Sequence, residues 1–260
     1  MSSLIADVQK QQDSRNLAID KVGVKDIRYP ITVLDRQQGR QQTVAAINMY
    51  ADLPHQYKGT HMSRFIEVLN RHSHDINLKN LRDLLEDMKR SLEASRAHIE
   101  ISFPYFMAKQ APISQAKALM EYHVTYLASL DEQGLDLVVQ TTVPITTLCP
   151  CSREISISGA HNQRSLVKLA VRFARFIWIE DLIALVESCA SCEIFSLLKR
   201  EDEKFVTEAA YANPRFVEDV VREVSLKISA DSNIFWFAVS VENMESIHNH
   251  SAYAFIERQK

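Results

Sequence analysis

Apolar and polar residues alternate with a period of two in several stretches of the chain. Between Val167 and Ala174, every second residue is Val, Leu or Phe, and the residues between them are Lys, Arg or Ala. This pattern is typical of an antiparallel strand that buries one face. Similar strand-like stretches are residues 31–50, 98–106, 118–130, 135–145, 234–241 and 252–256. The chain is therefore expected to be rich in antiparallel sheet.

Other stretches repeat their apolar residues every three or four positions, which predicts amphipathic helices. Residues 78–92 carry leucine or methionine at this spacing, and Asn77 is a plausible N-cap. A second helix is expected over residues 180–198. A third is expected over residues 213–228, where Asn213 would cap the helix and Pro214 would occupy its first position.

The order of these elements repeats along the chain. Each half reads strand, strand, helix, strand, strand, and the second half has an additional helix. The pattern G-x-H-x-x-R also occurs twice, at Gly59–Arg64 and Gly159–Arg164, starting 100 residues apart. We therefore predict an α+β fold of two related modules, with antiparallel sheets and helices layered on one face. The expected parts are a polar N-terminal extension (residues 1–30), a first module (31–131) and a second module (132–260).

The composition of the chain argues against several classes of function. The chain has 260 residues, of which 46% are hydrophobic and 24% charged, as in an ordinary globular protein. A formal net charge of −3 provides no electrostatic footprint for nucleic acid or an anionic membrane. No apolar run approaches the length of a membrane span, and the polar N-terminus lacks the apolar segment of an export signal. A cytoplasmic protein with free thiols is expected.

The segment around Cys149 and Cys151 is the strongest chemical signal. The two thiols are one residue apart, and His161 follows ten residues after the second. Thiolate and imidazole are ligands that zinc prefers. Pro150 between the thiols favours a bend at a strand end, where both side chains could face one cavity. The alternative is that both cysteines are small buried residues.

Cys189 and Cys192 form a C-x-x-C pair, but they fall within the helix expected over residues 180–198. Their spacing of three places them on one apolar face, so packing is the favoured interpretation. A structural zinc site that uses all four cysteines of the chain remains an alternative.

Two histidines and two carboxylates complete the candidates. His248 and His250 are two residues apart between expected strands and would share a face, which suits acid–base chemistry. Glu203 lies in a charge run typical of a solvated surface. Glu218 lies in the first turns of a helix, where a carboxylate is favoured by the helix dipole. Physical reasoning alone singles out neither glutamate.

Taken together, the motifs resemble those of GTP cyclohydrolase I of the type IB class, enzymes of the tunnelling fold that open folate biosynthesis. They occur in the order of that family and extend over most of the chain, from about residue 58 to about residue 253. The segments that carry the resemblance are Lys58–Phe65, Ser102–Phe106 with Ala111-Pro112, Leu148–Ser152, Gly159–Ser165, Leu197–Arg200 with Asp202–Lys204, Asn213–Asp219, and Glu242-Asn243 with Glu245–Ala252.

The resemblance implies two tandem tunnelling-fold modules per subunit, assembled as a homotetramer, with most of the metal site in the second module. It implies a divalent metal (zinc, manganese or iron) and hydrolysis of GTP to dihydroneopterin triphosphate and formate. The implied metal ligands are Cys149, His161 and Glu203. The implied purine anchor is Glu218, and the further active-site groups are Cys151, His248 and His250. The candidates for binding the triphosphate are Lys58, Arg64, Arg153 and Arg164.

Two segments, residues 107–110 and 173–179, resemble the family only loosely. The apolar run Phe176–Ile179 is expected at a subunit interface. Another tunnelling-fold enzyme, such as the nitrile reductase of queuosine synthesis, is the nearest rival, although the signature that follows its cysteine is absent here.

Overall fold

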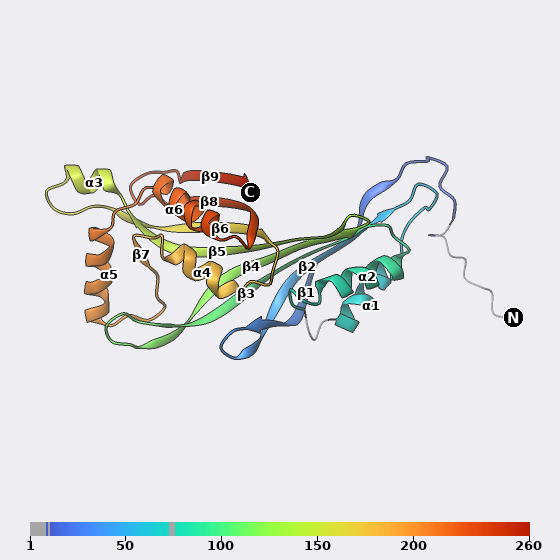
Figure 1. Cartoon of the computed structure of the whole chain (residues 1–260), viewed down its shortest axis with the longest axis horizontal. Coiled ribbons are helices and arrows are strands. Elements are labelled where there is room, and N and C mark those ends of the chain that lie inside the picture. The colour runs from blue at the N-terminus through green and yellow to red at the C-terminus, as the bar shows by residue number, and fades with distance from the viewer. Residues whose placement is uncertain (1–8, 10, 73–75) are drawn as a thin grey trace. The chain divides into compact units, whose positions relative to one another are not determined.

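The computed structural model describes residues 9, 11–72 and 76–260 (Figure 1). Within this part of the chain the strands form one sheet in the order β1-β2-β3-β4-β5-β6-β8-β9, and the short strand β7 pairs with β5. The strands are β1 (Ile19–Asp35), β2 (Gly39–Leu53), β3 (Ala97–Gln110), β4 (Lys117–Asp131), β5 (Gly134–Leu148), β6 (Asn162–Phe173), β7 (Cys192–Glu193), β8 (Ile234–Asn243) and β9 (Ala252–Gln259). The expected antiparallel pairing is found for β1–β2, β2–β3, β5–β6, β6–β8 and β8–β9.

The chain divides into two compact units. The first comprises the residues up to Phe103 together with Thr125–Val138, and the second comprises Pro104–Val124 and Val139–Lys260. Strands β3, β4 and β5 each contribute residues to both units.

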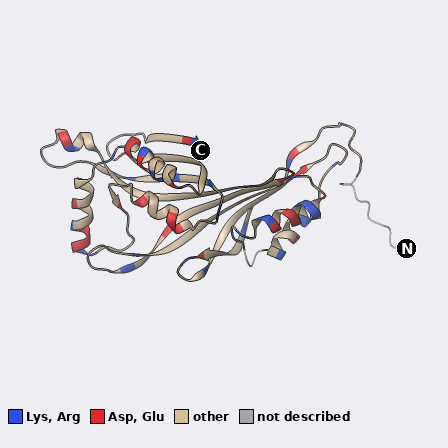
Figure 2. Ribbon diagram, in the orientation of Figure 1, with Lys and Arg blue, Asp and Glu red and all other residues tan. Residues whose placement is uncertain are grey.

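The first unit contains β1, β2 and the helices α1 (Met62–His72) and α2 (Leu81–Leu92). The two helices contact each other, and each buries one apolar face. Alternate residues of β2, such as Ile47 and Met49, are fully buried. Charged residues of both signs are mixed along the outer face of α2 (Figure 2). The alternation of buried and exposed positions therefore follows the pattern expected from the sequence.

The second unit contains β6, β7, β8, β9 and four helices: α3 (Pro150–Ile155), α4 (Ile179–Glu187), α5 (Arg200–Ala212) and α6 (Val217–Ala230). Helix α6 packs on β8 and β9 (Figure 1). Its buried face includes Val220, Val224 and Ile228, which recur at helical spacing. This layer of helix on sheet is the scaffold that carries the candidate site.

Three expected elements differ in the structure. The helix predicted over residues 180–198 ends at Glu187, because Ser191 forms tertiary hydrogen bonds with β5 and the next two residues form β7. The Ser191 backbone N–H donates to the carbonyl of Thr146, and its hydroxyl accepts from the N–H of Leu148. Cys192 therefore lies in a strand and not within a helix.

The predicted helix caps are also different. Helix α2 begins after Asn80 and not after Asn77. Asn213 ends α5, and α6 begins after Phe216. The amide of Asn213 donates to the carbonyl of Ala190, so a tertiary contact decides its role.

The N-terminal part of the chain is more structured than an extension. Residues 19–30, expected to lie outside the fold, belong to β1 and pair with β2. Residues 1–8 and 10 of the predicted extension lie outside the described residues. The predicted module boundary at residues 131/132 falls in the turn between β4 and β5, and it stays a prediction. In the described residues no helix is long and apolar enough to cross a membrane.

Candidate active site

The C-P-C segment forms the start of α3. Cys149 is the N-cap of this helix, and its Sγ accepts a hydrogen bond from the backbone N–H of Ser152 at 3.4 Å. Pro150 follows at the first helical position, where a missing N–H costs nothing. Cys149 is therefore half-buried, whereas Cys151 lies within the helix and is exposed. The structure therefore does not place the two thiols at alternate positions of a strand, the arrangement in which both could have faced one cavity.

Hydrogen bonds join the segments that carry Cys149 and His161. The N–H of Cys149 donates to the carbonyl of His161 at 3.1 Å. The hydroxyl of Ser152 accepts from the N–H of His161 at 3.2 Å and donates to the carbonyl of Cys149 at 3.1 Å. Gly159, with φ of +117°, supplies a backbone conformation that other residues rarely adopt. Two of the predicted metal ligands thus lie at the two ends of one closed loop.

The ring of His161 is held in a defined orientation. Its Nδ1 lies 3.0 Å from Oε1 of Gln163, whose buried amide donates from Nε2 to Oγ1 of Thr147 at 2.9 Å. This second bond turns Oε1 toward the ring, an arrangement that favours the tautomer with its proton on Nδ1 and its lone pair on Nε2. Glu245 Oε2 lies 3.9 Å from the same Nδ1. Such partners are typical of a histidine that binds a metal through its other nitrogen.

The third predicted ligand is less close to the pair. Glu203 lies in the first turn of α5 and is exposed. Among the described residues, no three His, Cys, Asp or Glu side chains are grouped closely enough to hold a metal ion. The structure therefore joins Cys149 with His161 but does not bring Glu203 to them. The donor types nevertheless fit a borderline-soft metal, since thiolate, imidazole Nε2 and carboxylate are its usual ligands.

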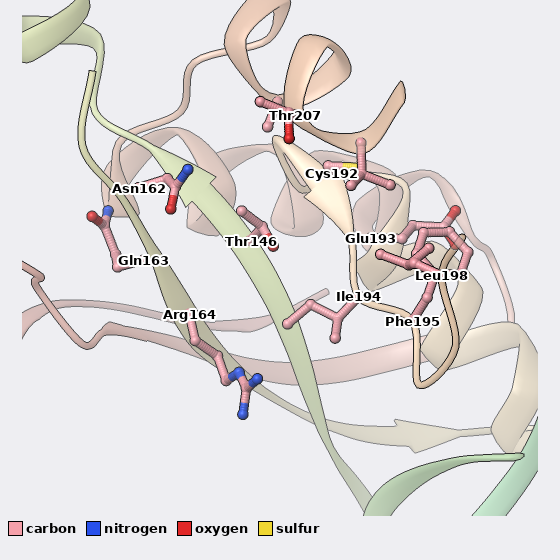
Figure 3. Close-up of a pocket in the computed structure, with 12 residues that line it drawn as sticks. Thr146, Asn162, Gln163, Arg164, Cys192, Glu193, Ile194, Phe195, Leu198 and Thr207 are labelled. Atoms are coloured by element: carbon pink, nitrogen blue, oxygen red, sulfur yellow. The ribbon is translucent and has the colours of Figure 1, made fainter. Parts of the chain in front are cut away.

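The second unit contains a cavity of about 460 Å³ (Figure 3). Asn162 and Arg164 line it from β6, immediately after His161. Thr207 lines it from α5, four residues after Glu203, which places both on the same helix face. The cavity is lined by Thr146, Asn162, Gln163, Arg164, Cys192, Glu193, Ile194, Phe195, Leu198, Val206, Thr207 and Ala210. The segments that carry His161 and Glu203 therefore border one cavity.

A charge cluster around the buried carboxylate of Glu187 lies next to one wall of the cavity. The ammonium of Lys109 contacts Glu187 and lies 2.9 Å from the carboxylate of Glu193, and the Tyr122 hydroxyl donates to Glu187 at 2.6 Å. Burial raises the pKa of Glu187, and the neighbouring Lys109 opposes that rise. Burial and the carboxylate of Glu187 raise the pKa of Tyr122. These bonds hold Glu193 on the cavity wall.

The remaining two cysteines have different environments. Cys189 is fully buried, and its thiol donates to the carbonyl of Leu185 at 3.3 Å. Burial raises the pKa of both Cys189 and Cys192, which disfavours their thiolate forms. The packing interpretation made from the sequence agrees with the environment of Cys189, whereas Cys192 lies in β7, outside a helix, and lines the cavity.

The other predicted residues are spread more widely. His248 and His250 stack with ring centroids 5.2 Å apart, so the prediction that they share a face is confirmed. Glu218 is exposed in the first turn of α6, where Asp219 and not Glu218 accepts the capping bond from Phe216.

The four basic side chains that are candidates for binding the triphosphate differ in the contacts that they already make within the protein. Lys58 and Arg64 lie in the first unit. Arg64 donates to the carbonyl of Ser91 at 2.9 Å. In the second unit, Arg153 of α3 stacks over the ring of Tyr211 of α5 at 4.9 Å, and Arg164 lines the cavity. Arg164 is thus the candidate that faces an open space large enough for a ligand.

Sequence reasoning missed Gln163 and Thr207, and it placed Glu245 only within the motif that carries the resemblance, with no role of its own. Gln163 could have been predicted from the sequence. The alternation along β6 makes it an inward position together with Ser165 and Val167. A buried glutamine next to a candidate ligand is a signal of a hydrogen-bonded support. Glu245 and Thr207 carry no such local signal.

Comparison with known proteins identifies the family. A family model described as "Type I GTP cyclohydrolase folE2" matches residues 5–254. Proteins named GTP cyclohydrolase FolE2 are similar over nearly their whole length. That of Syntrophotalea carbinolica is 59% identical over 251 residues (96% of this chain, 94% of the relative). That of Syntrophobacter fumaroxidans is 58% identical over 255 residues (98% and 99%).

Solved structures with a similar fold are uricases. That of Bacillus fastidious has a TM-score of 0.57 at 7% identity, covering 93% of both chains. That of Arthrobacter globiformis has a TM-score of 0.53 at 8% identity, again covering 93% of both chains. At this identity the likeness concerns the fold alone, and it confirms the predicted α+β tunnelling-fold architecture. With a family model that covers nearly all of it and relatives more than half identical to it, this chain belongs to the type I GTP cyclohydrolase folE2 family.

Proposed function

We propose that this chain is a GTP cyclohydrolase that hydrolyses GTP to 7,8-dihydroneopterin triphosphate and formate, the first step of tetrahydrofolate biosynthesis. Family membership over nearly the whole chain supports the reaction class. The observation that carries the proposal is the backbone hydrogen bond between Cys149 and His161. The residues that directly follow His161 line a cavity of about 460 Å³. A metal-binding pair next to a ligand-sized space is what a hydrolytic site requires.

Cys149, His161 and Glu203 are the residues that would hold a divalent metal, with zinc, manganese or iron all compatible with this donor set. When bound, such a metal would supply Lewis-acid activation of water for attack on carbon 8 of guanine. The chain contributes the orientation of the imidazole. Gln163 accepts from the Nδ1 side of His161, so Nε2 remains available as a ligand atom.

The remaining steps are proton transfers and base binding. Cys151, His248 and His250 are the groups we assign to moving protons while the imidazole ring of the base opens and formate leaves. The stacked pair supports this role, because two adjacent imidazoles can take and give protons near neutral pH. Glu218 is the proposed purine anchor, whose exposed carboxylate would accept hydrogen bonds from the N–H groups of guanine.

For the triphosphate we favour Arg164 over the other cations. Arg164 lines the cavity and is exposed, so its guanidinium is available for bidentate phosphate contacts. Lys58 is exposed and remains a second candidate, whereas Arg64 already donates to the carbonyl of Ser91 and Arg153 stacks on Tyr211.

We further propose that the enzyme is a homo-oligomer, and specifically a tetramer. Strand β9 is an edge strand of the sheet in the described chain, and it exposes the aromatic side chains of Tyr253 and Phe255. Exposed aromatic residues on an unpaired edge strand are typical of a surface that another subunit covers. The apolar run Phe176–Ile179 supports assembly less well than expected, because Ile177 and Ile179 are buried within their own unit.

The test uses the purified full-length protein stripped of metal by a chelator. GTP is added after loading with zinc, manganese or iron, and formate release and pterin fluorescence are recorded. We expect both products with at least one metal, and neither product in Cys149→Ala. A fully loaded protein that releases no formate from GTP would refute the proposal. Conversion of a nitrile substrate instead would favour the rival tunnelling-fold reductase.

A further inference from the structure

Lys109, near the end of β3, is a largely buried cation to which the proposed chemistry gives no role. Its side chain is 12% exposed. Its ammonium contacts the carboxylate of Glu187 at the end of α4 and lies 2.9 Å from Oε2 of Glu193 in β7. It also lies over the ring of Phe195, 4.7 Å from the ring centroid. One ammonium therefore joins the end of α4 to β7 and the residues that follow it.

Glu193 and Phe195 belong to the wall of the cavity of about 460 Å³ (Figure 3). Four consecutive residues, Cys192 to Phe195, line this cavity, and we call them the wall segment. Lys109 is not one of the residues that line the cavity. Because its ammonium contacts two of the four residues of the wall segment, it acts on the shape of the cavity through them.

Few regular hydrogen bonds hold the wall segment in place. Strand β7 consists of Cys192 and Glu193, which pair with Thr146 and Ile145 of β5. Residues 194–199 form neither helix nor strand. A segment of this kind opens locally at a low cost in free energy unless side chains restrain it. The two contacts of Lys109 are such restraints.

The other partner of Lys109 is fixed independently of the wall segment. Glu187 is 9% exposed, and its carboxylate also accepts a hydrogen bond of 2.6 Å from the hydroxyl of Tyr122 in β4. Glu187 therefore holds the ammonium from the side of α4, while Glu193 is its partner in the wall segment. Salt screens a buried ion pair much less than an exposed one, so these contacts persist at physiological ionic strength.

We propose that Lys109 is a positioning residue for substrate binding, which fixes the wall segment through Glu193 and Phe195. This inference rests on the proposed function, because it requires the cavity to receive GTP. Lys109 acts through the wall segment and not on the reacting atoms.

The first test measures the wall segment itself and needs no turnover. The thiol of Cys192 lines the cavity, so the rate of its reaction with N-ethylmaleimide reports how often the wall segment opens. The full-length protein is labelled for increasing times, and peptide mass spectrometry distinguishes Cys192 from the other three cysteines. Lys109→Met keeps an unbranched side chain but removes the charge. We expect its Cys192 to react about 10-fold faster than that of the wild type, equivalent to about 1.4 kcal/mol of local stability.

Tyr122→Phe is the matched control for general loss of stability. It removes the hydrogen bond to Glu187 in the same cluster but leaves both contacts of Lys109 with the wall segment. Its free energy of unfolding should fall, whereas its Cys192 should react at the wild-type rate. Equal acceleration in Tyr122→Phe and Lys109→Met overturns the inference, because the effect would then not depend on the wall contacts.

The second test separates substrate binding from chemistry. In the metal-loaded protein, Lys109→Met should raise KM for GTP about 10-fold and leave kcat and metal content close to the wild-type values. Tyr122→Phe should leave KM unchanged. An unchanged KM or an unchanged rate of Cys192 labelling in a folded Lys109→Met overturns the inference.

A double variant replaces Lys109→Met if that protein fails to fold. Removal of the cation leaves the buried carboxylate of Glu187 without its partner, which is strongly destabilising. Lys109→Met/Glu187→Gln removes that unpaired charge, and Glu187→Gln alone keeps the contact of Lys109 with Glu193. Only the double variant should show the faster labelling and the higher KM. The same values in both variants overturn the inference.

Labelling in the presence of GTP separates this inference from the proposed function. GTP should slow the labelling of Cys192 in the wild type, because the substrate would occupy the cavity. If the wild type turns over GTP but GTP does not slow the labelling, the proposed reaction stands and the role of Lys109 in substrate binding is wrong. If the wild type releases no formate from GTP with any metal, the proposed function is refuted and this inference with it.

Discussion

Two segments of the chain, Gly59–Arg64 and Gly159–Arg164, share the pattern G-x-H-x-x-R and yet have different environments. The first leads into helix α1, and its arginine donates to the carbonyl of Ser91 beside a cavity of about 30 Å³. The second leads into strand β6, and its arginine lines a cavity of about 460 Å³. The same six-residue pattern thus makes a structural contact in the first segment and borders the candidate site in the second.

The difference arises from the residues around the pattern. Position 163 is a buried glutamine that orients His161, whereas the equivalent position 63 is an exposed serine. Only the second segment is preceded by a thiol whose backbone bonds to the histidine. A short motif therefore indicates chemistry only when its neighbours can hold the side chains in place.

The sharpest way to break the comparison is to remove each histidine in turn. His161→Ala should lose bound metal and reduce turnover of GTP by about 10³-fold or more, because metal catalysis supplies several kcal/mol of transition-state stabilisation. His61→Ala should retain metal at wild-type stoichiometry. Metal analysis of both purified variants checks this. Equal metal loss in the two variants would mean that the two segments share one role.

The next test removes the support of the ring. Gln163→Leu keeps a similar volume but deletes the acceptor for His161, so metal affinity should fall about 10- to 100-fold. Ser63→Ala, at the equivalent position of the first segment, should leave metal affinity unchanged. Chelator competition gives both values. An unchanged affinity in Gln163→Leu would show that the ring is oriented by another group, such as Glu245.

The arginines should separate binding from stability. Arg164→Ala should raise KM for GTP by an amount equivalent to about 1.5–3 kcal/mol, the usual range for a hydrogen bond to a charged group. Arg64→Ala loses its bond to the carbonyl of Ser91, so its melting temperature should fall by about 2–4 °C, corresponding to about 1 kcal/mol. Steady-state kinetics and thermal unfolding measure the two effects. A larger KM effect for Arg64→Ala than for Arg164→Ala would reverse the assignment.

The two glycines should differ in stability alone, with Gly159→Ala destabilising the fold and Gly59→Ala not. Gly159 has φ of +117°, so Gly159→Ala should lower the free energy of unfolding by roughly 1–2 kcal/mol. Gly59 has no such conformation, and an added Cβ would lie at 3.4 Å from Cγ of Gln9, an ordinary contact. Gly59→Ala should therefore be neutral or stabilising by about 0.4–1 kcal/mol. Denaturant unfolding measures both, and equal destabilisation would contradict the backbone argument.

The strands were predicted well and the helices less well, for a physical reason. Buried and exposed residues alternate along each strand, so the local sequence is enough to predict the strand. Helix α5 was missed because it buries only Asp202 and Ala210 and so has no apolar stripe to detect. Helix α4 was predicted too long, because its end depends on the bond from Ser191 to Thr146 of β5.

The candidate site divides in the same way. A site formed by the cysteines of the C-P-C segment and His161 was predicted from residue types and spacing, the choice of Cys149 as a ligand came from the resemblance, and the family was identified from the series of motifs. The roles of Glu203 and Glu218 came only from resemblance, since an exposed carboxylate on a helix has no distinctive local environment.

By itself the sequence determined the alternating strands, the α+β class and the family, and it singled out the segment with Cys149, Cys151 and His161 as the candidate site. Only the tertiary structure decided that Cys149 caps a helix, that Thr147 turns the amide of Gln163 toward His161, and that Asp202 fastens α5 to a turn 88 residues earlier. The reason is that side-chain periodicity depends on neighbours in the chain. The partner of a buried hydrogen-bonding group depends instead on which distant segments folding brings together.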